Sequence, residues 1–169
     1  MPFISCNIKH LCEGNMSKKD TGLGNTLYQI STQYAFSREF NMTMDLRELF
    51  IYVNKLHDLG FDHNDNIFKL MFALFDKKEE AYPNVEYEVL SEEHNKGEIF
   101  DENFKNSVKQ HKTKNIKING YMQSFLYFHH YRAELYNLFK PSRDFTQYAE
   151  IQYPELFDEN TVAVSVHVR

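Results

Sequence analysis

The sequence predicts an α/β fold, and three local patterns support that prediction. Residues 2–8 form a short apolar run of β-forming residues, a glycine turn follows, and a helical stretch then leads into a second β-permissive segment. This order of strand, glycine loop, helix and strand is the usual opening of an α/β unit. Near the other end, residues 161–168 read TVAVSVHV with four valines on one face, which predicts a further strand.

The individual elements follow from periodicity and from chain-breaking residues. A helix is expected from Asn25, because asparagine is a good N-cap residue, and Pro141 is expected to end a late helix. The first helix should place Leu27, Ile30, Ser31 and Tyr34 on one face. The other expected elements are strands over residues 41–46 and 115–118, helices over 46–56, 66–75 and 122–138, and an acidic irregular segment over 81–97.

Composition excludes several classes of protein. The 169 residues are 42% hydrophobic and can build one domain with a sizeable core. The net charge of −5 and the scattered basic residues argue against nucleic-acid binding, which needs a basic face. The two cysteines form neither a disulfide framework nor a zinc pattern, and Cys6 is expected to be a buried apolar residue. Because the sequence shows neither a signal peptide nor a membrane span, it predicts a cytoplasmic protein.

The glycine turn is the first candidate site. Gly22 and Gly24 let a backbone approach a ligand closely, and the N–H groups of the following helix favour an anion such as a pyrophosphate. An ordinary structural turn explains the two glycines equally well. A dinucleotide fingerprint is a third interpretation, with Asp45 as the acidic residue about 20 positions on. That interpretation is disfavoured because Leu27 occupies the third glycine position and the loop before the turn is too long.

A metal site is not expected. The sequence has no Asp-x-Asp pair, which transferases that hold a sugar nucleotide through Mg²⁺ or Mn²⁺ generally need. Neighbouring positions on the late helix should also point His129 and His130 to different faces. One acidic and histidine-rich cluster is more typical of a solvated loop around Gly60, and consists of His57, Asp58, Asp62, His63 and Asp65.

Three segments together resemble the family 11 glycosyltransferases of the α-1,2-fucosyltransferase type. They are TGLGNTLYQISTQYAFSREFN, INGYMQSFLYFHHYRAELYNLFKPS and the terminal VAVSVHVR, which is similar to the strand carrying the His-x-Arg-Arg-Gly-Asp motif of that family. The resemblance extends over essentially the whole chain. Thr26 departs from the usual Gln and Thr21 from a common Gly, and the second Arg, the Gly and the Asp of the last motif are absent.

The resemblance implies a GT-B architecture of two Rossmann-like α/β domains, of which this chain would be an incomplete part. Residues 1–160 would form the N-terminal, acceptor-side domain, and residues 161–169 the first strand toward the donor-binding domain. The implied reaction transfers fucose from GDP-fucose to a glycan hydroxyl with inversion, without metal or cofactor. His167 and Arg169 would serve donor binding, with Arg169 at the pyrophosphate, while Gly22, Gly24 and Asn25 would line the cleft.

Two other functions stay open at this point. The chain can be a non-catalytic nucleotide-binding or interaction domain derived from the same fold, or an unrelated NAD-binding domain. Under the glycosyltransferase interpretation, the expectation is that DNA beyond the codon for Arg169 continues the motif, or that a second chain supplies the donor-binding half. The chain by itself should then show no fucosyl transfer and only weak GDP binding. No catalytic base can be named from the sequence.

Overall fold

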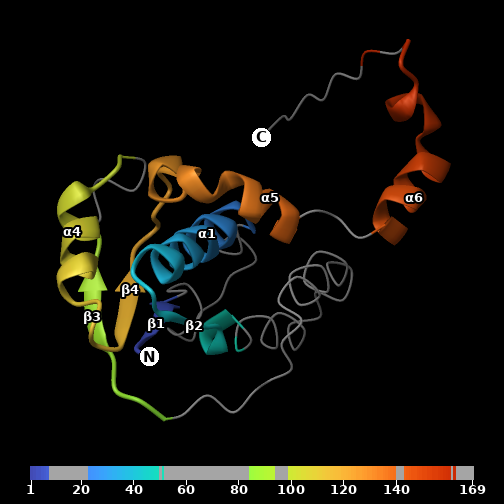
Figure 1. The fold of residues 1–169 in the computed structure, drawn as a ribbon. Helices are drawn as coiled ribbons and strands as arrows, with labels where there is room; N and C mark the ends of the chain where they lie inside the picture. Colours follow the sequence, from blue (N-terminus) through green and yellow to red (C-terminus); the bar gives the residue numbers. More distant parts are fainter. Residues whose placement is uncertain are drawn as a thin grey trace, which may run out of the picture.

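A parallel four-stranded sheet forms the centre of the molecule (Figure 1). The computed structural model describes residues 1–7, 23–49, 51, 84–93, 99–139, 143–160 and 162, and within them the chain has a mixed α/β fold, as predicted. The strands are β1 (Phe3–Asn7), β2 (Thr43–Asp45), β3 (Glu88–Ser91) and β4 (Ile116–Asn119). The helices are α1 (Leu23–Glu39), α4 (Glu102–Gln110), α5 (Arg132–Phe139) and α6 (Arg143–Gln152), with short 3-10 turns η4 (Phe125–Tyr127), η5 (His129–Tyr131) and η6 (Pro154–Phe157).

The strand order is β2-β1-β4-β3, and every neighbouring pair is parallel. Ile4 of β1 lies opposite Ile116 of β4, and Glu88 of β3 lies opposite the same Ile116. In the usual doubly wound sheets the strands on this side of β1 follow one another outward in sequence order, as in 2-1-3-4-5. Here the last two strands are exchanged: β3 lies outermost, and the chain returns through α4 to form β4 between β1 and β3.

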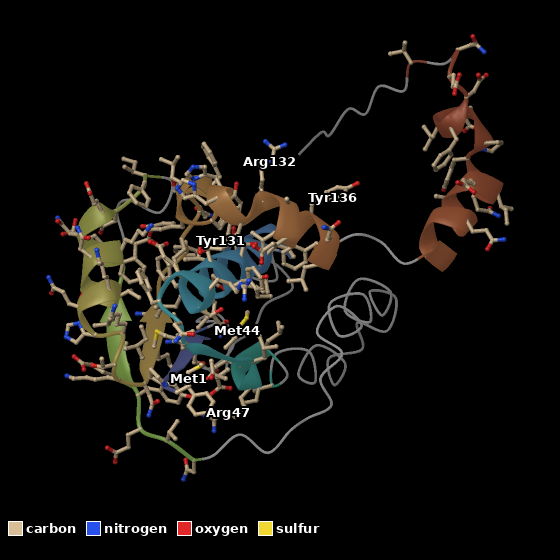
Figure 2. All side chains as sticks on the ribbon, viewed as in Figure 1. Met1, Met44, Arg47, Tyr131, Arg132 and Tyr136 are labelled. Carbon is tan, nitrogen blue, oxygen red and sulfur yellow. The ribbon has the colours of Figure 1, made fainter. Side chains whose placement is uncertain are left out.

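Helix α1 is covered on two sides, which the sequence did not predict. On the sheet side, Gln33 Nε2 donates to the carbonyl oxygens of Ile4 and Asp45, at 2.8 and 2.7 Å. On the other side, the Tyr34 ring lies 6.3 Å from that of Tyr131, which Figure 2 shows near the junction of α1 and α5. The expected face of Leu27, Ile30, Ser31 and Tyr34 lies within this continuous helix, and it is only partly buried: Ile30 and Ser31 are buried, whereas Leu27 and Tyr34 are half-buried. Asn25 is also not the N-cap, because α1 begins at Leu23.

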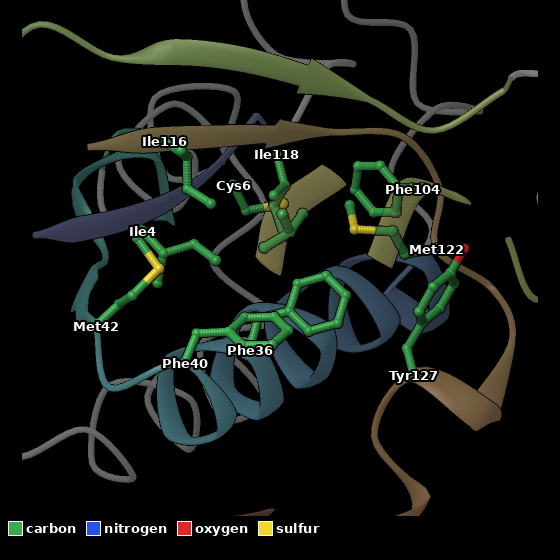
Figure 3. Packing of buried hydrophobic residues seen from close by; sticks show 11 residues of the cluster. Ile4, Cys6, Phe36, Phe40, Met42, Phe104, Ile116, Ile118, Met122 and Tyr127 are labelled. Carbon is green, nitrogen blue, oxygen red and sulfur yellow. The ribbon is translucent and has the colours of Figure 1, made fainter. Parts of the chain in front are cut away.

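The hydrophobic core lies between the sheet and the two helices α1 and α4 (Figure 3). The Phe36 ring is its centre, with ring centroids of Phe104 and Tyr127 at 6.1 and 5.9 Å. Such aromatic pairs contribute about 0.5–1.5 kcal/mol beyond the area that they bury. Cys6 is buried in this core as expected, and burial raises the pKa of its thiol. The other core members are Ile4, Phe40, Met42, Val108, Ile116, Ile118 and Met122.

The strands expected over residues 2–8, 41–46 and 115–118 are confirmed as β1, β2 and β4, and the first helix as α1. The irregular segment expected over 81–97 is wrong in part, because it contains β3. In this edge strand Glu88 and Leu90 are half-buried on one face, and Val89 and Ser91 are exposed on the other. Because only Leu90 packs against the core, the apolar signal is weak. Helix α4 was not predicted, although Asp101 caps its first turn and accepts from the Phe104 N–H at 3.0 Å.

The helix expected over 122–138 begins ten residues late. Met122 has a positive φ of 49°, and Ser124 is extended, so residues 120–124 form a loop before η4 and η5. Only residues 132–139 become α5. The backbone of Met122 is held out of the helical region because its N–H bonds to the Glu92 carboxylate at 2.8 Å.

The remaining expected elements fall largely outside the described residues. Of the expected 46–56 helix, residues 47–49 and 51 are helical and Leu46 is not, whereas residues 50 and 52–56 and the whole 66–75 helix lie outside that part. Of the expected strand 161–168 only Val162 is described, and it is exposed and not in a strand. Helix α6, which was not predicted, stands apart from the sheet and the other helices in Figure 1. None of the helices in the described ranges is long and apolar enough to cross a bilayer.

Candidate functional site

Two of the three segments that carry the family resemblance meet at the carboxyl end of the sheet. Gln123 Nε2, in the loop after β4, donates to Asn25 Oδ1 in the first turn of α1 at 2.6 Å. One turn further along α1, Gln29 Nε2 donates to the Gly120 carbonyl oxygen at 2.8 Å. The contacts join residues 98 and 91 positions apart in the sequence. Because ligands of parallel α/β sheets bind at the carboxyl ends of the strands, this junction is the candidate site.

A row of uncharged polar side chains borders the same edge. Asn7, Asn119 and Ser91 are the last residues of β1, β4 and β3, and they lie in register across the three strands. Asn119 Nδ2 donates to Ser91 Oγ at 3.0 Å, and Asn7 Nδ2 donates to Asn119 Oδ1 at 3.4 Å. Amides and hydroxyls of this kind both donate and accept, so they suit a ligand rich in hydroxyl groups.

The loop after β4 is held in place by a buried carboxylate. Glu92 directly follows β3, and its two oxygens accept from the Met122 N–H at 2.8 Å and the Tyr127 hydroxyl at 2.7 Å. The Tyr127 oxygen in turn accepts from the Asp101 N–H at 2.9 Å. Burial, reinforced by the hydrogen bond to Glu92, raises the pKa of Tyr127, so its hydroxyl stays protonated and donates. Glu92 therefore orders the loop that carries Gln123.

The two described glycines of the site differ in what surrounds them. A Cβ on Gly120 would lie 2.7 Å from the Cβ of Glu92, and the φ of +155° is itself unfavourable for other residues. Among the described residues, no atom lies within 4 Å of the position that a Cβ on Gly24 would take. Because glycine in a helix costs about 0.5–1 kcal/mol relative to alanine, packing against the described residues does not explain Gly24. The open space beside it is consistent with the expected close approach of a ligand.

The start of α1 is suited to an anion. Its first turn carries no acidic residue, so no side chain of that turn offsets the partial positive charge of the helix terminus. The N–H groups of a first turn also lack partners within their own helix. With Gly24 open on one side and Asn25 held by Gln123 on the other, a phosphate or polar ligand can approach this turn.

Asp45 is not available to a dinucleotide ribose. Its carboxylate is buried, forms an ion pair with Arg47 at 2.6 Å and accepts a hydrogen bond from the Tyr87 hydroxyl. Burial alone would raise the pKa of Asp45, but the hydrogen bonds from Arg47 and Tyr87 outweigh it and lower the pKa. Burial and the bond to Asp45 raise the pKa of Tyr87 to about 12. The cluster ties β2 to the segment before β3, and it weakens the NAD-binding interpretation.

The predicted site residues are only partly placed. Gly24 and Asn25 lie at the site, whereas Gly22, His167 and Arg169 lie outside the described residues. His129 and His130 do not point to different faces as expected, because η5 replaces the helix there and brings their ring centroids to 3.6 Å. Within the described ranges no three His, Cys, Asp or Glu residues gather to hold a metal ion. The five residues of the acidic and histidine-rich cluster around Gly60 are outside those ranges.

Three contributors to the site were not predicted from the sequence. Glu92 sits in an acidic stretch that gives no local signal, and Tyr127 was placed in a continuous helix. Gln29 lies within the first of the three resembling segments, but no role was predicted for it. Comparisons with protein-family models, with curated proteins and with solved structures found no match to this sequence.

Proposed function

We propose that this chain is the acceptor-side part of a GT-B glycosyltransferase that transfers fucose from GDP-fucose to a glycan hydroxyl with inversion. The observation that supports it most is the Gln123–Asn25 hydrogen bond of 2.6 Å, which brings two of the three resembling segments to one place. That place is the carboxyl end of a parallel sheet, where such folds bind their ligands.

The chemistry of the site supports a carbohydrate and nucleotide ligand. In the proposed reaction the acceptor oxygen attacks the anomeric carbon of fucose while GDP leaves. The amides of Asn7, Asn25 and Asn119 offer neutral hydrogen bonds to sugar hydroxyls, and the first turn of α1 offers N–H groups to the pyrophosphate. His167 and Arg169 complete the donor side in this proposal, as the family resemblance implies.

A second candidate is a nucleotide-binding or interaction domain without catalysis. It is favoured by Glu92, a carboxylate beside the candidate site in the described part of the chain, because both of its oxygens are engaged in holding the loop. A carboxylate committed in this way is not poised to take the acceptor proton. The two candidates share ligand binding and differ in turnover.

Calorimetric titration of the full chain with GDP-fucose, GDP and NADH tests the shared claim. GDP-fucose and GDP should bind and NADH should not. Gly24→Ala should weaken binding, since its methyl group fills the open space beside the first turn, and Asn25→Ala should weaken it by loss of the Gln123 contact. Asn106→Ala and Gln110→Ala, both on the exposed side of α4, are matched controls and should bind as the unchanged chain does.

Transfer of labelled fucose to a glycan mixture then separates the two candidates. Binding with fucose transfer supports the enzyme. Binding without transfer supports the non-catalytic domain, provided that transfer is also absent when an Arg-Gly-Asp continuation is fused after Arg169. NADH binding that is lost in Gly24→Ala would instead support the dinucleotide interpretation and end the glycosyltransferase proposal.

A further inference from the structure

A largely apolar cavity of about 470 Å³ opens on the outer side of α1, away from the candidate site. We call it the α5 cavity, because α5 and the turns before it form most of its wall. Phe125 and Tyr136 line it and are 59% and 69% exposed, which is unusual for large side chains beside an apolar hollow. Figure 2 shows Tyr136 and Arg132 projecting outward from α5.

The end of α6 and the following η6 turn carry large apolar side chains that are exposed. Ile151, Leu156 and Phe157 are 66%, 54% and 48% exposed, and Tyr153 is exposed between them. In Figure 1 this pair of elements stands away from the rest of the described chain. Exposed apolar groups so close together in sequence are typical of a surface that packs against another one.

The guanidinium of Arg132, at the wall of the α5 cavity, can pair with carboxylates of the other surface. The α5 cavity has Arg132 and His129 at its wall, with His130 stacked on His129 at a ring-centroid distance of 3.6 Å. The α6–η6 segment is acidic over the stretch that carries its apolar residues. Residues 143–160 contain one basic residue, Arg143, and five carboxylates, Asp144, Glu150, Glu155, Asp158 and Glu159.

The connection between α5 and α6 permits an antiparallel pair. Only residues 140–142 separate Phe139 from Arg143, and helices joined by two to five residues commonly form such hairpins. At about 1.5 Å per residue, Ile151 lies about 12 Å from Arg143, and Arg132 lies about 10 Å from Phe139. A folded-back α6 therefore brings Ile151 level with Arg132, and brings Leu156 and Phe157 level with η4 and η5.

We propose that α6 and η6 fold back along α5 of the same chain and fill the α5 cavity with Leu156 and Phe157. The acidic residues of the segment then lie against Arg132 and the two histidines. This docking covers the exposed aromatic side chains of both surfaces. It does not depend on the proposed transferase function, because neither surface includes Asn25 or Gln123.

A single engineered tryptophan tests the docking, since the chain contains no Trp. Phe157→Trp in the full chain should fluoresce at shorter wavelength and be quenched several-fold less by acrylamide than Ile99→Trp, whose position is exposed in the loop before α4. Adding Tyr136→Glu to Phe157→Trp should move both readouts to those of Ile99→Trp. Leu156→Trp gives a second, independent position if Phe157→Trp lacks the circular-dichroism spectrum of the unchanged chain.

The outcomes decide between the possible occupants. Protection that is the same from low to high protein concentration supports docking within one chain. Protection that is lost on dilution would mean that a second copy supplies α6 and η6, which overturns the proposal. The proposal would also be overturned if Phe157→Trp and Leu156→Trp, in folded protein, were both quenched as strongly as Ile99→Trp.

Discussion

Glu92 and Gly120 show how two residues direct the chain as it leaves β4. The Glu92 side chain lies where a side chain at position 120 would have to be, and its carboxylate then takes the N–H of Met122. Met122 adopts a left-handed backbone as a result, and the helix that the sequence favours from this position cannot start. The side chain of Gln123 is thereby placed beside Asn25.

Alanine substitutions at the two described glycines of the site should have opposite effects. Gly120→Ala should destabilise the chain by about 3 kcal/mol, because the new Cβ overlaps Glu92 and the backbone is strained. Gly24→Ala should stabilise it by about 0.5–1 kcal/mol, because it lies in a helix with free space around it. Urea unfolding of both variants measures the difference, and a stable Gly120→Ala variant would show that Glu92 does not constrain this loop.

Glu92→Gln should also destabilise the chain, although the side chain keeps its size. The carboxylate accepts from both Met122 and Tyr127, and an amide offers only one acceptor oxygen to these two donors. One buried donor is left unpaired, at a cost of about 1–3 kcal/mol. The urea midpoint should fall accordingly; Gln110→Glu, on the exposed side of α4, serves as a charge-change control and should leave it unchanged within about 0.5 kcal/mol.

Among the helices and strands, those that bury a single apolar face were predicted most accurately. Strands β1 and β4 were predicted correctly because their apolar residues all face the core, namely Ile4, Cys6, Ile116 and Ile118. For helix α1 the sequence predicted one buried face only, whereas a second side packs on the sheet, where Gln33 donates to strand carbonyls from a position at which an apolar residue is expected. Strand β3 and the late start of α5 depend on long-range contacts that no local pattern contains.

In the candidate site too, some residues were predicted from local patterns and others depend on long-range contacts. Gly24 and Asn25 were predicted from the glycine turn and the family resemblance, and the structure places both at the carboxyl end of the sheet. Glu92 was not predicted, because its role exists only after β3 has paired with β4. Local patterns thus name the residues proposed to face a ligand, and the residues that hold them in place are determined by tertiary structure.

Helix α4 was not predicted from periodicity, but Asp101 at its N-cap allows the contribution of capping to be measured. Asp101→Ala should cost about 1 kcal/mol, because the side chain accepts from the Phe104 N–H at 3.0 Å. Asp101→Asn should cost almost nothing, since asparagine caps equally well. Thermal unfolding followed by circular dichroism compares the two, and equal losses would indicate that the charge of Asp101, rather than its cap, matters.

For the whole molecule, the two faces of the sheet are stabilised differently. One face packs against α1 and α4 through the aromatic core, whereas Asp45, Arg47 and Tyr87 form a polar cluster linking β2 to the chain before β3. The cluster extends to Lys117, whose ammonium lies 5.6 Å from the Tyr87 ring centroid and pairs with Glu48 at 2.7 Å. Stability should therefore depend on the ionisation of Asp45.

The pH dependence has a definite sign. The folded pKa of Asp45 lies below its usual value of about 3.9 because of Arg47 and Tyr87, so the unfolded chain binds this proton more readily. The stabilisation is present above about pH 4 and is lost as the pH falls toward the folded pKa. Asp45→Asn should lower the unfolding free energy at pH 7 and flatten its slope between pH 4 and pH 2. An unchanged slope in that variant would assign the acid sensitivity to other carboxylates.

The proposed function requires that the junction of α1 with the loop after β4 binds a sugar nucleotide. Titration of the ¹⁵N-labelled full chain with GDP-fucose, followed by amide NMR spectra, locates the ligand directly. We expect chemical-shift changes concentrated at Gly24, Asn25, Gln29 and residues 119–124. In Gly24→Ala these changes should no longer appear on addition of GDP-fucose. Changes confined to α4 or to the α5 cavity, or the same pattern with NADH, would contradict it.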